Sequence, residues 1–356
     1  MKILDRYLTR ELLGPFSFCV FGFTVVLLTG LLFQLTDLIF VHDVAVGTVA
    51  RMLLYRIPAT VVTTLPIATL FSTLLAVGRL VQDSEMTVMR GSGVAYPRLI
   101  VPILVLGLLI SAGTYLASEY IVPPANTKFE NTLRRIIFSD GVPLVEENVF
   151  FHGGDDRYFY IGEVDTKTHE LKKILVYELS TNGFPNITTA QTGIFHDRVW
   201  VLFDGVYQEL DEDGFVQFES RFERMEIVTE QEGEVYFGNQ RSVEEMSRRE
   251  LAEYIERFQR GGLKVRSWVI EHHMRLALPM ASFVFALFAL ALMGKGGRAF
   301  GIVLSLAILL VYYVAVSVAR SLGINEVLPP LVSAWLVNTL FAVTGFVFLI
   351  LSDRWY

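Results

Sequence analysis

Six long stretches contain no Asp, Glu, Lys or Arg, and they constrain the fold more than any other feature of the chain. They are Leu12–Thr36, Ile57–Gly78, Leu99–Ser118, Leu276–Gly294, Ala299–Ala319 and Val327–Ser352. Each is about as long as a helix needs to be to cross a hydrocarbon core of ~30 Å. A charge at the bilayer centre costs roughly 2.5–3.5 kcal/mol, so charge-free runs of this length favour membrane spans. Because the chain is also 53% hydrophobic, we expect an integral membrane α-helical bundle with six transmembrane helices.

The basic residues of the short loops predict how this bundle is oriented. Cytoplasmic loops of membrane proteins carry an excess of Lys and Arg. With the N-terminus inside, the cytoplasmic side would hold Lys2, Arg6, Arg10, Arg79, Arg90, Arg98, Lys295, Arg298 and Arg354. The short loops of the opposite side would hold only Arg51, Arg56 and Arg320. We therefore expect both termini in the cytoplasm and the region between the third and fourth spans outside it.

Residues 125–270, between the third and fourth spans, have a different chemistry. They hold 17 basic and 27 acidic residues, a net charge of −10, whereas the rest of the chain has a net charge of +3. Several runs rich in β-branched and aromatic residues predict strands: KKILVYEL, NITTAQTGIF, RVWVLF, VYQEL and FVQFESRFERMEI. The dipeptides Asn182-Gly183, Asp204-Gly205 and Asp213-Gly214 suit hairpin turns. We expect an inserted all-β extracytoplasmic domain built as a sandwich, a jelly roll or an open barrel.

An amphipathic helix is expected to lead the chain back to the membrane. Ser247 and Glu250 match a capping box, and three apolar residues then share one helical face: Leu251, Ile255 and Phe258. The predicted domains are transmembrane helices one to three with the loop helix (1–124), the β domain (125–246), the connecting helix and linker (247–267) and transmembrane helices four to six (268–356).

The sequence offers no catalytic or nucleotide-binding arrangement. The stretch GKGGRAFG lacks the spacing of a GxxxxGK[ST] phosphate loop, and the six histidines follow no metal-ligand pattern. The span centres hold no ionisable residue, which disfavours a proton- or ion-coupled carrier. We therefore predict no catalytic residue, no metal and no cofactor in this chain, and we do not expect it to be an enzyme.

The stretch DSEMTVMRGSG lies between the second and third spans and predicts a short helix at the membrane surface. Asp83 or Ser84 can cap this helix, and Gly91 can end it. Met86 and Met89 would share one exposed face, and methionine suits an adaptable docking surface. The helix either lies among lipid headgroups or acts as a coupling helix that inserts into a cytoplasmic partner.

Four stretches resemble the LptF/LptG family of lipopolysaccharide export permeases. SEMTVMRGSGV is similar to the cytoplasmic loop of that family, and LDRYLTRELLGPF to its entry into the first span. EYIVPPAN resembles its exit from the third span, and RLALPMASFVFAL its opening of the fourth. The resemblance extends over the whole chain and includes the order of three spans, a β domain and three spans. It implies that the β domain is jellyroll-like.

The resemblance also implies a function and a set of partners. The chain would be the permease subunit of an ABC-type lipopolysaccharide exporter in the cell inner membrane, with its large domain in the periplasm. Its implied partners are a paralogous LptF/LptG-type permease, an LptB-type ATPase dimer, a periplasmic jellyroll bridge protein and a single-span LptC-type subunit. The implied ligand is lipopolysaccharide, and no nucleic acid is expected. The loop helix would dock on the ATPase through Glu85, Met86, Met89, Arg90 and Gly91.

Two other classes of protein are open alternatives. One is a permease of another ABC-type lipid or lipoprotein release system, although its four-span type carries the large domain between spans one and two. The other is an intramembrane enzyme, which the missing catalytic residues disfavour. The residues do not distinguish an LptF-like from an LptG-like paralogue.

Three arginines are candidates for lipid headgroup contact because they lie at the extracytoplasmic ends of spans. Arg51, Arg56 and Arg320 either reach ordinary headgroups or meet the phosphates of the transported lipid. The bulky run from Tyr158 to Ile161 fits equally well a lipid groove or the core of a β-sandwich.

Three glycines in the first span are candidates for helix packing. Gly14, Gly22 and Gly30 recur every eight residues and are predicted to fall roughly on one helical face. Small residues let helices approach closely in lipid, whereas scattered glycines would only make the span flexible. The resemblance implies that this span meets the fifth span of the paired subunit.

Overall fold

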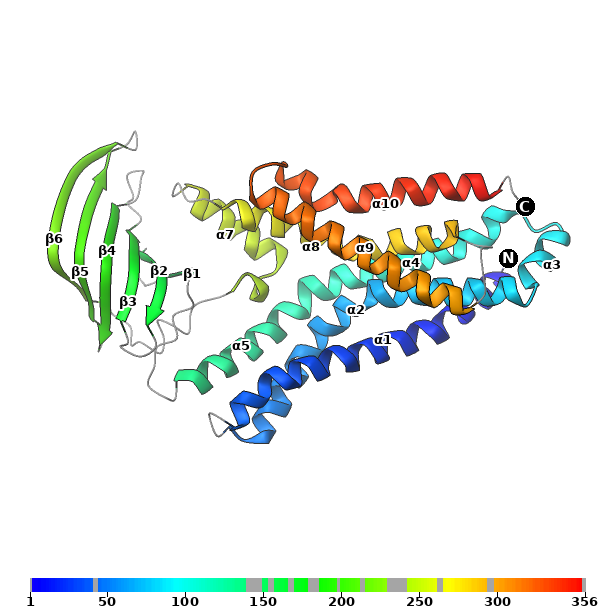
Figure 1. The fold of residues 1–356 in the computed structure, drawn as a ribbon, viewed down its shortest axis with the longest axis horizontal. Helices are drawn as coiled ribbons and strands as arrows, with labels where there is room; N and C mark the ends of the chain where they lie inside the picture. Colours follow the sequence, from blue (N-terminus) through cyan, green and yellow to red (C-terminus); the bar gives the residue numbers. More distant parts are fainter. Residues whose placement is uncertain are drawn as a thin grey trace.

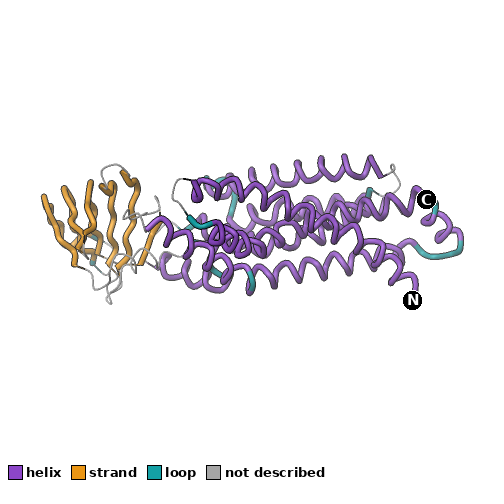
Figure 2. The backbone as a smooth tube through the Cα atoms, turned by 90° about the horizontal axis from the view of Figure 1, so that it is seen from below, coloured by secondary structure: helices purple, strands orange, loops and turns teal. Residues whose placement is uncertain are grey.

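The computed structural model shows a bundle of long helices with a β-sheet at one end (Figure 1). It describes residues 2–40, 44–138, 149–152, 157–165, 170–178, 186–196, 199–211, 215–228, 242–260, 265–292 and 298–353. Figure 2, turned by 90°, shows the strands side by side beyond the same end of the bundle. The sheet therefore lies beyond one end of the helical bundle.

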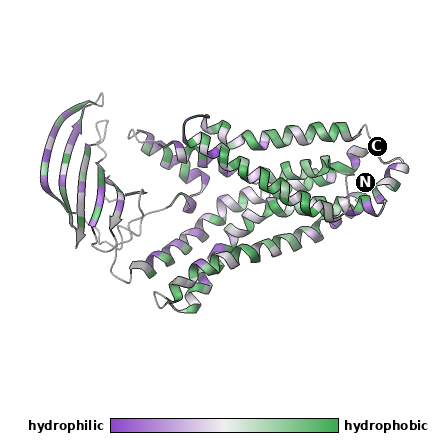
Figure 3. Cartoon of the chain, in the orientation of Figure 1, coloured by the Kyte–Doolittle hydropathy of each residue, from purple (hydrophilic) through white to green (hydrophobic). Residues whose placement is uncertain are grey.

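Six helices in the described part of the chain are long and apolar enough to cross a membrane. They are α1 (Lys2–Phe40), α2 (Val46–Gln82), α4 (Tyr96–Tyr120), α8 (Arg266–Ala291), α9 (Arg298–Ile324) and α10 (Pro330–Asp353). Each coincides with one predicted span, so the six-span prediction is confirmed. Figure 3 shows hydrophobic residues along these helices and more hydrophilic ones on the elements near the sheet.

The first two helices are longer than the charge-free runs that predicted them. At about 1.5 Å per residue, the 39 residues of α1 extend about 58 Å, nearly twice a ~30 Å hydrocarbon core. Part of α1 and α2 must therefore project beyond the membrane. α1 begins and α10 ends at the end of the bundle opposite the sheet (Figure 1).

Helix α8 lies at the centre of the bundle and contacts α2, α4, α9 and α10. Small residues make this packing close. A Cβ atom on Gly107 of α4 would lie 2.8 Å from the Cβ atom of Ala286, and one on Gly345 of α10 would lie 3.2 Å from the Cα atom of Phe288. Glycine at these two crossings lets α4 and α10 approach α8, which is how helices associate in lipid.

A buried hydrogen-bond chain also joins three of the helices. The Tyr312 hydroxyl of α9 donates to Oδ1 of Asn338 in α10 over 2.8 Å, and Nδ2 of Asn338 donates to the carbonyl oxygen of Ala277 in α8 over 2.6 Å. The Tyr312 hydroxyl and both amide atoms of Asn338 thus have partners, which a site shielded from water requires.

The described strands form one antiparallel sheet in the order β1 to β6. They are β1 (Val149–His152), β2 (Arg157–Asp165), β3 (Glu170–Glu178), β4 (Asn186–His196), β5 (Val199–Leu210) and β6 (Val216–Val228). The all-β inserted domain is therefore confirmed. Within these strands each one pairs with the next along the chain, so they show a meander rather than the crossovers typical of a jelly roll.

One predicted hairpin turn is wrong. Asp204-Gly205 lies inside β5, which runs unbroken and merges the two strands predicted on either side of it. Asp204 adopts a left-handed conformation with φ of 52°, which Asp tolerates better than most residues. A Cβ atom on Gly205 would lie 2.2 Å from Cζ of Phe222. Within the strand, Asp204 therefore adopts a locally irregular backbone conformation, and Gly205 allows a close contact with Phe222. The other two predicted turn dipeptides lie outside the described residues.

The β domain also begins later than predicted. Residues Val122–Phe138 form α5, and among the described residues the first strand begins at Val149. On α5, Phe129, Leu133 and Ile136 recur at helical spacing and pack against apolar residues of α1 and α2. The expected boundary at residue 125 misses this helix because charged residues on its outer face interrupt the apolar pattern.

The sheet buries its core on one face. Phe159 and Ile161 of β2 are fully buried there, and the Phe159 ring stacks on Trp200 with centroids 4.7 Å apart. Tyr158, on the opposite face of the same strand, is buried against helix α7 (Arg248–Arg260). The bulky run from Tyr158 to Ile161 thus packs on both faces, as the core interpretation predicts.

Helix α7 confirms the predicted capping box. The Ser247 N–H donates to Oε2 of Glu250 over 2.7 Å, and the Glu250 N–H donates to Oγ of Ser247 over 3.2 Å. Its buried face joins an aromatic cluster in which the Phe258 ring contacts Tyr158, Tyr254 and Trp268. Burial in this cluster raises the pKa of the Tyr254 hydroxyl. The cluster connects the sheet to α7 and to the first turn of α8.

Candidate functional site

The predicted loop helix is present as α3 (Glu85–Gly91), at the end of the bundle opposite the sheet (Figure 1). Its N-terminus differs from the prediction. Ser84 has a left-handed conformation with φ of 60°, and its side chain makes no capping hydrogen bond. Asp83 instead ends α2, where its carboxylate lies 3.4 Å from Nε of Arg79. The α2–α3 connection is thus a sharp turn rather than a capped start.

The end of α3 is fixed by backbone hydrogen bonds. The Val94 N–H donates to the carbonyl oxygen of Met89 over 3.1 Å, and the Gly93 N–H to that of Arg90 over 2.9 Å. This pair of bonds is the Schellman motif, which requires a left-handed residue after the helix. Gly93 supplies it, with φ of 85°. The helix ends at Gly91 as predicted, but the conformation that ends it belongs to Gly93.

The expected exposed methionine face is wrong. Met86 is buried in an apolar cluster with Leu8, Leu12 and Leu80, and Met89 packs against the same cluster. The apolar face of α3 therefore covers the ends of α1, α2 and α4 in its own chain. The outward face carries Val88, which is 65% exposed. A partner would meet this outward face instead of the methionines, because burial in the chain's own core outweighs exposure of flexible apolar side chains.

Glu85 is held by two other helices. Its Oε2 atom accepts a hydrogen bond of 2.5 Å from the Tyr7 hydroxyl of α1, and its Oε1 atom lies 3.5 Å from Nη2 of Arg79 in α2. The Glu85 side chain stays 34% exposed. It therefore has both internal partners and access to solvent.

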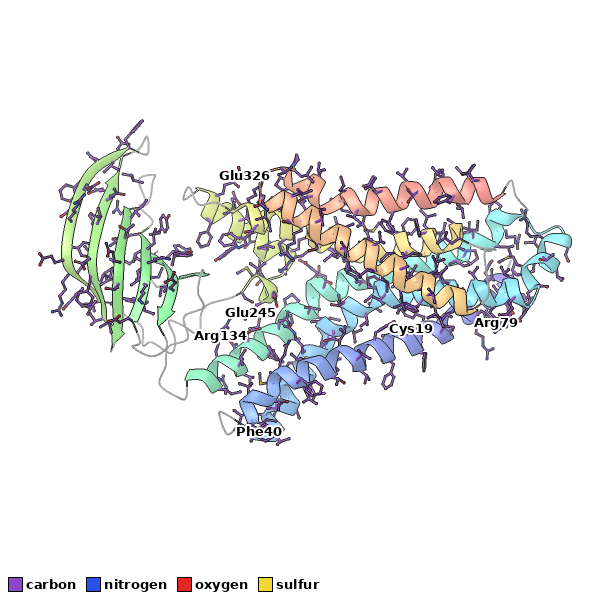
Figure 4. All side chains as sticks on the ribbon, in the orientation of Figure 1. Cys19, Phe40, Arg79, Arg134, Glu245 and Glu326 are labelled. Carbon is purple, nitrogen blue, oxygen red and sulfur yellow. The ribbon has the colours of Figure 1, made fainter. Side chains whose placement is uncertain are left out.

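Arg79 is the centre of this cluster, at the end of the bundle opposite the sheet (Figure 4). Its guanidinium also forms an ion pair with Glu11 of α1, so it faces carboxylates from α1, from α3 and from Asp83 at the end of α2. The i,i+4 spacing of Arg79 and Asp83 is visible in the sequence. The roles of Tyr7 and Glu11 are not, because these residues lie on another helix, and sequence reasoning missed them.

A second polar cluster lies at the sheet end of the bundle, where the chain returns from the β domain through the short helix η1 (Val243–Glu245). Arg134 of α5 forms an ion pair with the fully buried carboxylate of Glu245 (Figure 4). Arg275 of α8 donates hydrogen bonds to the carbonyl oxygens of Val243 and Met246. Two long helices thus fasten the segment that leaves the sheet.

The three candidate arginines for lipid contact have different surroundings. Nη1 of Arg56 donates to Oδ1 of Asn126 over 3.3 Å, and its Nη2 lies 3.5 Å from Glu244. Arg320 forms an ion pair of 2.9 Å with Glu271 of α8. Arg51 is exposed on α2. The first two are therefore engaged with their own chain, and lipid contact by any of the three stays a prediction.

The three glycines of α1 do not share one helical face. Eight residues advance an α-helix by about 80° beyond two turns, so Gly14 and Gly30 point about 160° apart. A Cβ atom on Gly14, Gly22 or Gly30 would meet nothing within 4 Å. These glycines therefore mediate no close packing among the described residues, in contrast to Gly107 and Gly345.

The chain thus combines six apolar helices, an inserted antiparallel sheet after the third of them and a short loop helix after the second. The model of the family described as lipopolysaccharide export system permease LptF/LptG matches residues 6–351, nearly the whole chain. A search of curated proteins gives no match. On the extent of the family match, the chain belongs to the LptF/LptG family of lipopolysaccharide export permeases.

Proposed function

We propose that this chain is the transmembrane subunit that couples ATP hydrolysis by a cytoplasmic ATPase dimer to extraction of lipopolysaccharide from the inner membrane. The extracted lipid passes to a periplasmic bridge protein. In this proposal ATP hydrolysis takes place in the partner, the termini and α3 face the cytoplasm, and the sheet lies in the periplasm. The positive charges of the short loops support this orientation.

The observation that carries the proposal is the position of α3. It is a short helix whose C-terminal end is fixed by backbone hydrogen bonds, and its apolar side is buried in its own bundle. Its outward face and the partly exposed Glu85 carboxylate lie at the end of the bundle farthest from the sheet. When a cytoplasmic partner moves, an element in this position can transmit the movement to α1 and α2. These two helices extend to the end of the bundle near the sheet.

The physical properties of the lipid support the rest of the proposal. Exposing an acyl chain of about twelve carbons to water costs on the order of 10 kcal/mol, at ~0.8 kcal/mol for each CH₂. The lipid must therefore move along apolar surfaces. Many apolar side chains of α1, α9 and α10 point outward in the single chain, including Phe18, Leu310 and Phe346. These faces suit membrane lipid and a second, paralogous permease, with an LptC-type subunit as a further partner.

A permease of another ABC-type lipid or lipoprotein release system is the second candidate. The four-span type of that class carries its large domain between the first and second spans. Here the sheet follows α4, the third spanning helix. This order of elements favours lipopolysaccharide export. An intramembrane enzyme is the weaker alternative.

Purification of the tagged chain from its native membrane in mild detergent tests the proposal. Mass spectrometry should identify a nucleotide-binding ATPase and a second permease of the same family in the same particle, and the particle should hydrolyse ATP. The chain separated from the ATPase should not. Isolation of the chain without an ATPase, or activity of the separated chain toward a lipid substrate, would favour the alternatives.

A further inference from the structure

We propose that Tyr7 and Arg79 are positioning residues that hold the Glu85 carboxylate and make the start of α1 move together with α3. The inference rests on the proposed function, because it concerns how a movement delivered at α3 reaches the spanning helices. It assigns part of the coupling to α1, a helix that is separated from α3 in the sequence by the whole of α2.

The first argument is the geometry around Glu85. Its two carboxylate oxygens face different helices: the Tyr7 hydroxyl of α1 donates to Oε2 over 2.5 Å, and Nη2 of Arg79 in α2 lies 3.5 Å from Oε1. A hydrogen bond to an ionised carboxylate is stronger than one between neutral groups. The side chain of Glu85 is thus fixed from two sides before any partner binds.

The second argument is that Arg79 joins the same helices again. Its guanidinium pairs with Glu11 of α1 and approaches Asp83 at 3.4 Å. An arginine carries five N–H donors in a rigid plane and remains charged, so it can serve several carboxylates together. Tyr7 and Glu11 lie four residues apart on α1, and both therefore reach this cluster from the same face of the helix.

The third argument is that apolar packing follows the same path. Met86 of α3 is buried with Leu8 and Leu12, which belong to the same stretch of α1 as Tyr7 and Glu11. Farther along, α1 packs chiefly on α2 and exposes many large apolar side chains, such as Phe21 and Phe33. Its start is thus attached to α3, whereas much of its length has few neighbours in this chain. A movement of α3 can therefore reorient α1.

The fourth argument is that internal and external contacts of Glu85 are compatible. A carboxylate has about four acceptor sites, and the described contacts of Glu85 occupy fewer than that. Its side chain remains 34% exposed. A basic side chain of a partner can therefore bind Glu85 while Tyr7 and Arg79 retain it. The carboxylate then links the partner directly to α1.

Distance measurement on the purified complex gives the most direct test. Spin labels at Ile3 and Val88, both exposed, would report the separation of α1 and α3 in a Cys19→Ser background. We expect this distance to stay single and narrow through the nucleotide cycle in the parent protein. Tyr7→Phe keeps the ring but removes the hydroxyl, and it should broaden the distribution. A distribution as narrow as in the parent would overturn the inference.

Transport per ATP gives the functional readout. In Tyr7→Phe the lipopolysaccharide moved per ATP hydrolysed should fall about tenfold or more, as for loss of one hydrogen bond to a charged group. Tyr120→Phe, an exposed tyrosine on α4, is the matched control and should change nothing. In a Glu85→Gln background, Tyr7→Phe should have a smaller effect, because the hydrogen bond that the Tyr7 hydroxyl donates to a neutral amide oxygen is weaker than the one to a carboxylate.

The outcomes separate the inference from the function on which it rests. A parent complex that moves no lipid with ATP contradicts the proposed function itself. A parent complex that moves lipid, combined with a Tyr7→Phe variant of equal transport per ATP, contradicts only the positioning role. Full additivity of Tyr7→Phe and Glu85→Gln would also overturn that role.

Discussion

The carboxylate of Glu245 is fully buried against the guanidinium of Arg134, although 111 positions separate the two residues in the chain. Arg134 belongs to α5, which enters the β domain, and Glu245 to η1, which leaves it. The ion pair therefore closes the base of the inserted domain. Because a buried charge is tolerated only with its partner, the two segments are held together.

Removal of this carboxylate should destabilise the junction strongly. Glu245→Ala leaves the Arg134 charge without its partner in a largely buried place, and such a loss costs about 3–5 kcal/mol. Thermal unfolding of the purified chain in detergent should show the loss. Glu253→Ala is the control, because it removes an exposed pair with Arg249 and should cost less than about 1 kcal/mol. Equal effects of the two substitutions would contradict the structural role of Glu245.

Substitution of a glycine at a helix crossing should destabilise the chain more than substitution of a glycine on the outer face of α1. Gly107→Val inserts atoms next to Ala286 and should cost about 1–3 kcal/mol of stability through overpacking. Gly22→Val meets nothing within 4 Å and should leave the unfolding of the isolated chain nearly unchanged. The measurement is thermal unfolding of both variants in detergent. A Gly22→Val chain as unstable as the Gly107→Val chain would contradict this packing.

Substitutions on the outer face of α1 should affect the protein only after it has assembled with the second permease. We predict that Gly22→Phe or Gly30→Phe impairs export or pairing with the second permease more than Leu27→Phe or Leu31→Phe, since small residues allow close helix contacts. Heterodimer yield and export measured in parallel test this prediction. Equal tolerance at all four positions would mean that α1 is a passive anchor.

The end of α3 should depend on Gly93 and not on Gly91. Gly93→Ala forces a side chain into a left-handed conformation at a cost of roughly 1–2 kcal/mol. Gly91→Ala lies in the helix and should stabilise it by up to about 1 kcal/mol. Hydrogen exchange of the α3 amides in the isolated chain should become faster in the first variant and slower in the second. The opposite order would rule out the Schellman end.

Photocrosslinkers test the three arginines at the sheet end. In place of Arg51, Arg56 or Arg320 they should capture lipopolysaccharide in the membrane if these positions meet its phosphates. Arg51 should give the highest yield, because the side chains at positions 56 and 320 face Glu244 and Glu271 of their own chain. Capture of bulk phospholipid alone would indicate ordinary headgroup contact.

The spanning helices could be predicted from sequence because a single physical term, the cost of a charge in hydrocarbon, determines them. The α7 capping box was likewise local and was confirmed. The hairpin turn predicted at Asp204-Gly205 is wrong because the same dipeptide occurs both in turns and in irregular strands. Only the contact of Gly205 with Phe222 distinguishes the two cases. Helix α5 was missed because it is amphipathic and lies beside a span.

The coupling site was only partly visible in the sequence. The position and length of α3 follow from local signals, whereas the direction of its methionine face depends on Leu8 and Leu12, nearly eighty residues away. The contact between Tyr7 and Glu85 is equally remote in sequence. Local patterns therefore located the helix, and tertiary packing determined which of its faces is free.

Transfer of lipopolysaccharide from reconstituted vesicles to a crosslinker-bearing bridge protein tests the central claim most directly. The complex with the parent chain should transfer lipid only while ATP is hydrolysed. Glu85→Lys should weaken ATPase binding roughly 10–150-fold, the equivalent of about 1.5–3 kcal/mol for hydrogen bonds to a charged group, and transfer should fall with it. Glu326→Lys, an exposed change at the opposite end of the bundle (Figure 4), should leave transfer intact. Transfer that proceeds without ATP, or a Glu85→Lys complex that assembles and exports like the parent, would contradict the account.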